Sequence, residues 1–245
     1  MNTAIILAGG LGSRLHPYTL TIPKPLLPLG GTPIIEIVIK QLSRQGFKRI
    51  IVSIGYLGEM IKFHLGDGTK FDVNIEYVSE DNPLGTAGSL FLIKNLPEKF
   101  IVMNGDLLTS FPFNDLLESL NSNQVKAAVA CHNRNVQIEY GVLRKDSNNR
   151  LEEYVEKPTL SYLVSMGIYA FDVETLTLLS GEKIDMPTFL DKIRSEKGGV
   201  HVFESHHYWQ DIGRIQDFEQ ASQDFESNPV KFIEGGPFNE QFVQP

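Results

Sequence analysis

The chain has 245 residues, of which 42% are hydrophobic and 21% are charged. This composition is typical of globular proteins, and the length suffices for one large α/β domain. The formal net charge is −8 and there is no long basic run, which argues against nucleic acid as the main ligand. No apolar run approaches the ~20 residues of a membrane span, and no basic segment precedes the first apolar run, as a signal peptide requires. The single cysteine, Cys131, excludes an intrachain disulfide and favours a reducing, cytoplasmic location.

The first element is a short apolar run over residues 4–8, which predicts a buried strand of a parallel sheet. It leads into Gly9, Gly10 and Gly12, where backbone N–H groups can approach a polyphosphate closely. Arg14 follows, and its guanidinium is a forked donor suited to phosphate oxygens. The stretch predicts an anion site directly after the first strand.

A lysine extends this predicted anion site. Lys24 lies between Pro23 and Pro25, which predicts that it is carried on a stiff, extended loop. The two familiar phosphate motifs do not fit. A dinucleotide fingerprint would need glycine where Leu15 stands, and a Walker A loop would need a Gly-Lys pair, which this stretch lacks.

The combination resembles the signature of the sugar-phosphate nucleotidyltransferases, also called nucleoside-diphosphate-sugar pyrophosphorylases. The family pattern is L-A-G-G-x-G-x-R-L followed by P-K-P, and the chain matches it at Leu7–Leu15 and Pro23–Pro25. The resemblance implies that Arg14 and the glycine loop hold the β- and γ-phosphates, and that Lys24 holds the reacting phosphates. The implied nucleotide contacts in this stretch are Leu7, Ala8, Gly9, Gly10, Gly12, Ser13, Arg14 and Lys24.

Apolar periodicity predicts an alternation of strands and helices along the rest of the chain. Strands are expected at residues 49–54, 73–78, 99–103, 125–131, 140–144, 151–155, 163–171 and 200–203, and helices at 34–46, 59–65, 87–96, 114–121, 185–195 and 214–225. This order predicts an α/β fold with a Rossmann-like, mostly parallel mixed sheet flanked by helices. Ligands of such sheets bind at the carboxyl ends of the strands.

The expected organisation is a single catalytic domain over residues 1–226, which the resemblance covers. Its nucleotide-binding part is expected at about 1–135, and a sugar-phosphate-binding part with a sheet extension at 136–226. A polar C-terminal tail is expected over 227–245, where no firm pattern is present.

The segment 80–89 is similar to the family's P-L-G-T-A-G nucleotide-binding loop, which implies nucleotide contacts from Pro83, Gly85, Thr86 and Ala87. Relatives that use uridine or thymidine triphosphate have Gln where this chain has Glu80. A carboxylate only accepts hydrogen bonds, and guanine presents two adjacent donors, N1–H and N2–H. Glu80 therefore favours GTP; the alternative is an ordinary solvated loop glutamate. Thr86 is also expected to cap the helix at 87–96.

Two aspartates are the candidate metal ligands. Asp106 follows the strand at 99–103, where an aspartate can also simply cap a turn. The resemblance implies that Asp106 binds the catalytic Mg²⁺, and that Asp211, in the family's W-x-D-I-G ending, supplies the second carboxylate. The adjacent histidines His206 and His207 point in different directions from an extended chain and do not predict a zinc site.

The second half carries three segments that resemble the family's sugar-phosphate motifs. In the first two, Gly141 would let the sugar approach the backbone, Glu156 would accept from sugar hydroxyls, and Lys157 would bind the sugar's phosphate. In the third, many relatives have Asn where this chain has Ser165, which leaves the sugar open. The implied sugar-phosphate contacts are Asn104, Gly105, Tyr140, Gly141, Glu156, Lys157, Ser165 and Gly167.

The resemblance, closest to mannose-1-phosphate guanylyltransferase-type members, implies a Mg²⁺-dependent transfer of a nucleotide from GTP to a sugar 1-phosphate, with release of pyrophosphate. The catalytic residues would be Arg14, Lys24, Asp106 and Lys157, in a pathway of nucleotide-sugar and cell-surface polysaccharide biosynthesis. Mannose, glucosamine-type and heptose 1-phosphates all fit, and UTP, dTTP or CTP are alternatives to GTP. A non-catalytic nucleotide-sugar-binding paralogue and a glycosyltransferase are the competing classes. No nucleic acid or membrane partner is expected, and the oligomeric state is left open, a homo-oligomer included.

Overall fold

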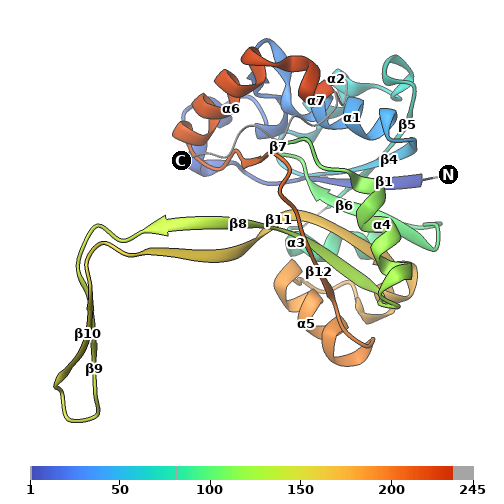
Figure 1. Cartoon of the computed structure of the whole chain (residues 1–245). Coiled ribbons are helices and arrows are strands. Elements are labelled where there is room, and N and C mark those ends of the chain that lie inside the picture. The colour runs from blue at the N-terminus through green and yellow to red at the C-terminus, as the bar shows by residue number, and fades with distance from the viewer. Residues whose placement is uncertain (1, 81, 234–245) are drawn as a thin grey trace.

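The computed structural model describes residues 2–80 and 82–233. Its centre is a seven-stranded sheet in the order β12-β8-β11-β6-β1-β4-β5 (Figure 1). Only β11 in this sheet runs antiparallel to its neighbours, and the remaining pairs are parallel. The prediction of a mostly parallel mixed sheet is confirmed. The strands are β1 Asn2–Ala8, β4 Phe47–Ile54, β5 Asn74–Ser79, β6 Lys99–Asn104, β8 Ala127–Gln137, β11 Thr159–Asp172 and β12 His201–Glu204.

Helices cover both faces of this sheet. One face packs against α1 (Ile34–Arg44), α2 (Gly58–Leu65) and α4 (Phe113–Ser122), and the other against α3 (Gly85–Gly88) and α5 (Met186–Glu196). Three two-stranded pairs complete the sheet structure: β2 (Pro28–Leu29) with β3 (Thr32–Pro33), β7 (Leu107–Thr109) with β13 (Trp209–Asp211), and β9 (Val142–Lys145) with β10 (Leu151–Val155). Short 3₁₀ turns lie at Ser13–Leu15, Tyr18–Leu20, Lys24–Leu26, Thr69–Phe71, Ser89–Leu92 and Val173–Leu178.

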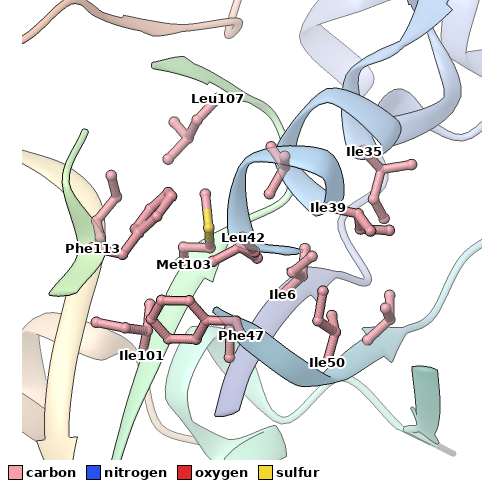
Figure 2. Packing of buried hydrophobic residues seen from close by; sticks show 14 of the residues in the cluster. Ile6, Ile35, Ile39, Leu42, Phe47, Ile50, Ile101, Met103, Leu107 and Phe113 are labelled. Carbon is pink, nitrogen blue, oxygen red and sulfur yellow. The ribbon is translucent and has the colours of Figure 1, made fainter. Parts of the chain in front are cut away.

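The first strand is buried on both faces, as its unbroken apolar run predicts. Ile6 packs on the α1 side with Ile39 and Met103 (Figure 2). Ile5 points to the opposite face and packs with Phe100 and the α5 side chains. Because both neighbours of β1 in the sheet are parallel to it, the carboxyl ends of three strands meet at one edge.

A third apolar cluster joins the two ends of the chain. Helices α6 (Ile215–Ser227) and α7 (Pro229–Ile233) pack through Phe225 and Phe232 against Leu27 and Leu29, which follow the Pro-Lys-Pro segment. The expectation of a polar tail from residue 227 is therefore wrong for 227–233, because Phe232 is only 1% exposed. The rest of that expected tail, residues 234–245, lies outside the described residues.

The helix expected over 87–96 is also wrong. The helical segment is α3 followed by a 3₁₀ turn that ends at Leu92, and Asn95 adopts a left-handed backbone conformation with φ 56°, which a helix does not tolerate. Thr86 does not cap it: its hydroxyl accepts a 2.7 Å bond from the backbone N–H of Met186 at the start of α5.

Two strands are longer than their apolar runs suggested. The outer part of β8 reaches Gln137 and pairs with the outer part of β11, which begins at Thr159. Together with the β9–β10 hairpin they form an arm, residues 132–165, that projects from the body in Figure 1. Within the described parts of the chain, no helix has both the length and the apolar character needed to cross a membrane.

The buried α7 generates the first prediction. Phe232→Ala should lower the free energy of unfolding by about 3–5 kcal/mol, because it leaves a cavity between α7, Phe225 and Tyr208. Val230→Ala on the same helix, at a side chain 50% exposed, is the matched control and should change stability by less than about 0.5 kcal/mol. Urea denaturation followed by circular dichroism measures both; equal midpoints for the two variants would show that α7 is not part of the folded core.

Candidate active site

The carboxyl ends of β1 and β6 bring the start of the glycine loop into contact with the segment that carries Asp106. Gly105, just after β6, donates its backbone N–H to the carbonyl of Leu7 at 2.9 Å. A Cβ atom on Gly105 would lie 3.1 Å from that carbonyl oxygen, closer than such contacts normally are. Asn104, Gly105 and Asp106 therefore lie beside Leu7 and Ala8, at the edge where the sequence predicts ligand binding.

Lys24 reaches this edge. Its side chain is largely buried and its ammonium forms an ion pair with Oδ2 of Asp106. The expected extended loop is found only at Pro23 (φ −64°, ψ 140°), since Lys24 itself starts the 3₁₀ turn Lys24–Leu26. Proline is tolerated in the first turn of a helix because its missing N–H would have no partner there. The lysine is thus held more rigidly than an extended loop would hold it.

Asp211 is brought to Asp106 by a backbone pairing. Strand β13 lies antiparallel to β7, with Asp211 opposite Leu107, and the N–H of Ile212 donates to the carbonyl of Asp106 at 3.1 Å. Burial raises the pKa of the Asp211 carboxyl, and the negative charge of Asp106 raises it further, while Lys24 and Arg14 act in the opposite direction. The two carboxylates lie close enough to repel each other.

The donor set at this edge suits a hard divalent cation. Oδ1 of Asp106 is buried and has no hydrogen-bond partner, so it has an unfilled acceptor site. The described residues contain no group of three or more His, Cys, Asp and Glu side chains that could hold a metal. A cation between Asp106 and Asp211 would have to complete its coordination with water or ligand oxygens, as Mg²⁺ commonly does.

Arg14 and the glycine loop border the aspartates. Gly12 has φ +64°, a conformation that favours glycine, and its carbonyl accepts a 2.8 Å bond from the hydroxyl of Thr19. A Cβ atom on Gly213 would lie 3.1 Å from Oδ2 of Asp211 and 3.5 Å from the guanidinium of Arg14, so these two side chains are neighbours. Gly9 packs against Gly55, whereas nothing lies within 4 Å of a Cβ atom placed on Gly10; Gly10 and Ser13 are exposed, so this side of the loop is open.

Glu80 has a structural role in the described fold. Its Oε2 accepts the backbone N–H of Leu84 at 2.8 Å, and its Oε1 accepts a long 3.4 Å bond from Ser53. The carboxylate therefore closes the loop that contains Pro83. Oε1 retains acceptor capacity for a ligand, because the bond to Ser53 is weak.

The following segment packs on the chain before α5. Gly85 has φ +81°, and a Cβ atom there would lie 2.6 Å from the carbonyl oxygen of Ile184. The N–H of Ala87 donates to the same carbonyl at 3.1 Å. Gly85 thus allows two backbone segments to approach closely. The N–H of Ala87 is already bonded and is not free to bind a nucleotide base.

Half of the residues assigned to the sugar phosphate gather at the sheet edge. Gly167 has φ +71°, and a Cβ atom on it would lie 2.5 Å from Nδ2 of Asn104. The hydroxyl of Ser165 accepts the N–H of Gly167 at 3.3 Å and lies 3.2 Å from that of Tyr169. Asn104, Gly105, Ser165 and Gly167 are therefore brought together beside Asp106.

The other four residues assigned to the sugar phosphate lie on the arm. Tyr140 is 78% exposed, and Gly141 lies against Glu156, whose carboxylate accepts a 2.9 Å bond from the hydroxyl of Tyr154. Lys157 lies just before β11, which begins at Thr159, and the eight-residue separation from Thr159 to Gly167 along this strand corresponds to roughly 26 Å. Figure 1 shows this part of the arm well away from β1, so Tyr140, Gly141, Glu156 and Lys157 are not brought to Lys24 and Asp106.

Three residues near these groups were missed by the sequence reasoning. Thr19 fixes Gly12, and nothing in its local pattern marks it. Tyr154 orients Glu156, and their two-residue spacing on a predicted strand was an available signal. Asp217 accepts the N–H of Arg214 at 2.9 Å and the side-chain amide of Gln210 at 3.3 Å; an acidic residue in the first turn of a predicted helix was the available signal.

A family model described as "Nucleotidyl transferase" matches residues 3–228. The chain belongs to the nucleotidyl transferase family. The resemblance seen in the glycine loop and the Pro-Lys-Pro segment is thereby confirmed at the level of the family.

Individual relatives of this chain carry more specific names than the family. The chain is 30% identical over 223 residues to the mannose-1-phosphate guanylyltransferase catalytic subunit beta of Danio rerio, covering 88% of this chain and 62% of the relative. It is 33% identical over 224 residues to the mannose-1-phosphate guanyltransferase of Yarrowia lipolytica, covering 87% and 61%. The chain thus spans about three fifths of the length of these relatives.

Solved structures share the fold. HddC from Yersinia pseudotuberculosis superposes with a TM-score of 0.73 at 28% identity, covering 92% of this chain and all of HddC. A second HddC structure, complexed with GMP-PN, gives a TM-score of 0.70 at 27% identity, covering 92% of this chain and all of that one. A putative glucose-1-phosphate thymidylyltransferase from Bacillus anthracis gives 0.71 at 24% identity, covering 98% of each chain, and supports the fold alone.

The repulsion at Asp211 generates the second prediction. Because its folded pKa is raised, ionisation of Asp211 destabilises the folded state; this effect is absent below the unfolded pKa and complete above the folded pKa. Asp211→Asn should therefore raise the melting temperature at neutral pH in EDTA, by roughly 2–4 °C per kcal/mol of burial cost and repulsion relieved. The gain should shrink toward pH 4. Asp191→Asn, at an exposed carboxylate paired with Arg194, is the control; a melting temperature of Asp211→Asn that is unchanged or lower at neutral pH would contradict the assigned repulsion.

Proposed function

We propose that this nucleotidyl transferase is a sugar-1-phosphate guanylyltransferase: it joins GTP to a sugar 1-phosphate and releases pyrophosphate. The observation that carries the proposal is the convergence of Arg14, Lys24, Asp106 and Asp211 beside an open glycine loop at the carboxyl edge of the sheet. Two cations and two carboxylates in this arrangement suit the binding of a triphosphate.

The reaction needs alignment and charge neutralisation rather than a general base. A sugar phosphate is already anionic at neutral pH, so its oxygen can attack the α-phosphorus of the triphosphate in line while pyrophosphate leaves. Arg14 and the N–H groups of the glycine loop hold the β- and γ-phosphates, and Lys24 holds the reacting phosphates. Such contacts lower the barrier by stabilising charge that develops on the phosphate oxygens.

Asp106 and Asp211 would hold Mg²⁺ together with phosphate oxygens and water. The unpartnered Oδ1 of Asp106 and the nearby Asp211 carboxylate support this assignment. When bound, Mg²⁺ supplies charge neutralisation at the phosphates. The ammonium of Lys24, paired with Asp106 in the described structure, would then turn from the carboxylate toward the phosphate.

The names of the relatives and Glu80 favour GTP and a mannose-type sugar 1-phosphate. Mannose-1-phosphate guanylyltransferases match most of this chain, and HddC has been solved with GMP-PN. Ser165 leaves the sugar open, and a heptose or glucosamine-type 1-phosphate fits the same segments. A cytoplasmic location accords with these substrates.

The test is a matrix of GTP, UTP, dTTP, CTP and ATP against mannose, glucosamine, glucose and heptose 1-phosphates, with and without Mg²⁺, read as pyrophosphate release. Release with GTP and one sugar phosphate that EDTA abolishes is the expected result. Pyrophosphate release with another triphosphate would support the nucleotidyltransferase class but show that guanine is the wrong base. A chain that binds GTP but releases nothing with any pair would be a non-catalytic binding protein.

Lys24 generates the third prediction. Lys24→Ala should lower kcat by about 10²–10³-fold, because it removes one electrostatic contact to the reacting phosphates. Lys48→Ala is the matched control, since Lys48 forms only a surface ion pair with Asp72, and it should stay within about twofold of wild type. Steady-state pyrophosphate release measures both. A Lys24→Ala rate within threefold of wild type means that the lysine does not hold the reacting phosphates.

Glu80 generates the fourth prediction. Glu80→Gln should lower kcat/KM for GTP more than for UTP or dTTP, by roughly tenfold or more, because the amide NH₂ leaves one guanine donor unpaired. The amide oxygen can keep the bond from the N–H of Leu84, so the loop should stay closed. Glu76→Gln is the control, since Glu76 pairs with Arg49 on the neighbouring strand. An unchanged ratio of GTP to UTP use would leave Glu80 with its structural role alone.

A further inference from the structure

The arm, residues 132–165, is the least covered part of the described fold. None of these residues is buried. Figure 1 shows that the arm reaches away from the body and that no other element lies beside its hairpin. A two-stranded ribbon that stands alone is at best marginally stable in water, so the arm needs a covering surface.

One face of the ribbon of the arm carries most of its apolar side chains, together with Arg134 and His132. Residues directly opposite each other in an antiparallel pair share a face. Leu160 opposes Val136, with Tyr162 next along the same face, and they are 38%, 46% and 52% exposed. The other face carries Ser161 opposite Asn135 and Thr159 opposite Gln137, and also Leu163, 54% exposed, opposite Asn133. This alternation is typical of a sheet that buries one face.

The charge of the arm argues against nucleic acid and anionic membranes as its partner. Residues 132–165 contain five Lys or Arg and five Asp or Glu, so the arm is neutral and the net charge of −8 belongs to the rest of the chain. A neutral ribbon lacks the positive charge that nucleic acid or an anionic membrane surface attracts. It can dock on an acidic protein surface, such as another copy of this chain, without net repulsion.

The site and the arm are each incomplete in a single chain. Arg14 and Lys24, the cations that the described residues place at this site, are assigned to the triphosphate, and Lys157, assigned to the phosphate of the second substrate, lies far along the arm. Seven consecutive pairs, from Ser165 opposite Cys131 to Thr159 opposite Gln137, proceed without a register shift. Folding the arm back onto its own site would break part of this pairing, whereas a second copy can accept the arm as it stands.

A surface suited to the arm flanks the site. Leu11 lies in the glycine loop, and Tyr18 and Leu20 lie between that loop and Lys24 in the sequence; they are 63%, 51% and 53% exposed. A standard interface removes about 800 Å² per copy from water, and the exposed apolar and aromatic side chains on the arm and on this flank are of the kind that such an interface buries. Contact there would place the end of the arm next to Lys24.

We propose that two copies of this chain exchange arms, so that Glu156 and Lys157 of each copy complete the sugar-phosphate site built on Lys24 and Asp106 of the other. The proposal rests on the nucleotidyl transfer function stated above. The exchange is reciprocal and gives a closed dimer with twofold symmetry, the commonest symmetry of protein oligomers. Exchange of identical elements forms a dimer at a low cost in free energy.

Complementation between two inactive variants tests the exchange. Lys24→Ala and Lys157→Ala should each lose most activity. A mixed dimer has one site in which both lysines are intact, so random mixing should restore about a quarter of wild-type pyrophosphate release. Differently tagged chains isolate the mixed dimers. If isolated mixed dimers are no more active than either variant alone, each arm serves its own chain and the proposal is overturned.

The oligomeric state gives a readout that does not depend on activity. The wild-type chain should sediment as a dimer at micromolar concentration, and Tyr162→Asp should convert it to monomers. Phe63→Asp, at a phenylalanine 93% exposed on α2 and outside the arm, should leave the dimer intact. A monomeric wild type, or a dimer that Tyr162→Asp does not affect, overturns the exchange. A dimer that depends on Tyr162 but releases no pyrophosphate with any substrate pair would instead show that the proposed function is wrong.

Discussion

Two carboxylates, Asp106 and Asp211, are held side by side at the carboxyl edge of the sheet, and the fold must oppose their repulsion. Main-chain structure holds them there: β13 pairs with β7, and the N–H of Ile212 binds the carbonyl of Asp106. Lys24 and Arg14 offset part of the repulsion. Because backbone hydrogen bonds fix the two strands, the carboxylates stay together without needing a ligand between them.

The apolar clusters explain how Lys24 and Arg14 are kept at this edge. Leu15, one residue after Arg14, is fully buried in the same cluster as Leu27 and Leu29, which follow Lys24. Phe225 and Phe232 of the C-terminal helices complete that cluster. The loop that carries both cations is thus anchored on each side by helices from the other end of the chain, which limits the conformational entropy it would otherwise lose on binding a ligand.

The sequence predicted the features that depend on residues close together in the chain. The apolar runs gave the parallel strands, and the glycine loop after the first strand placed the candidate site at the correct edge. Contacts between residues far apart in the sequence could not be predicted from local patterns. Thr86 accepts a hydrogen bond from the start of α5 instead of capping its own helix. Phe232 is buried only because residues distant in the sequence cover it. The meeting of Asp106 with Asp211 followed from the family resemblance and not from any spacing. The projection of the arm depends on pairing between β8 and β11, which alternating polar and apolar residues alone do not distinguish from a shorter, folded hairpin.

The irregularity in β11 links the arm mechanically to the sheet edge. Between Ser165 and Tyr169 the register with β8 shifts, and Gly167 there takes a left-handed conformation against Asn104. A strand that is tightly paired on both sides of such a point transmits twist from one segment to the other. The root of the arm is therefore packed directly against Asn104, two residues before Asp106, and the position of the arm is tied to that edge of the sheet.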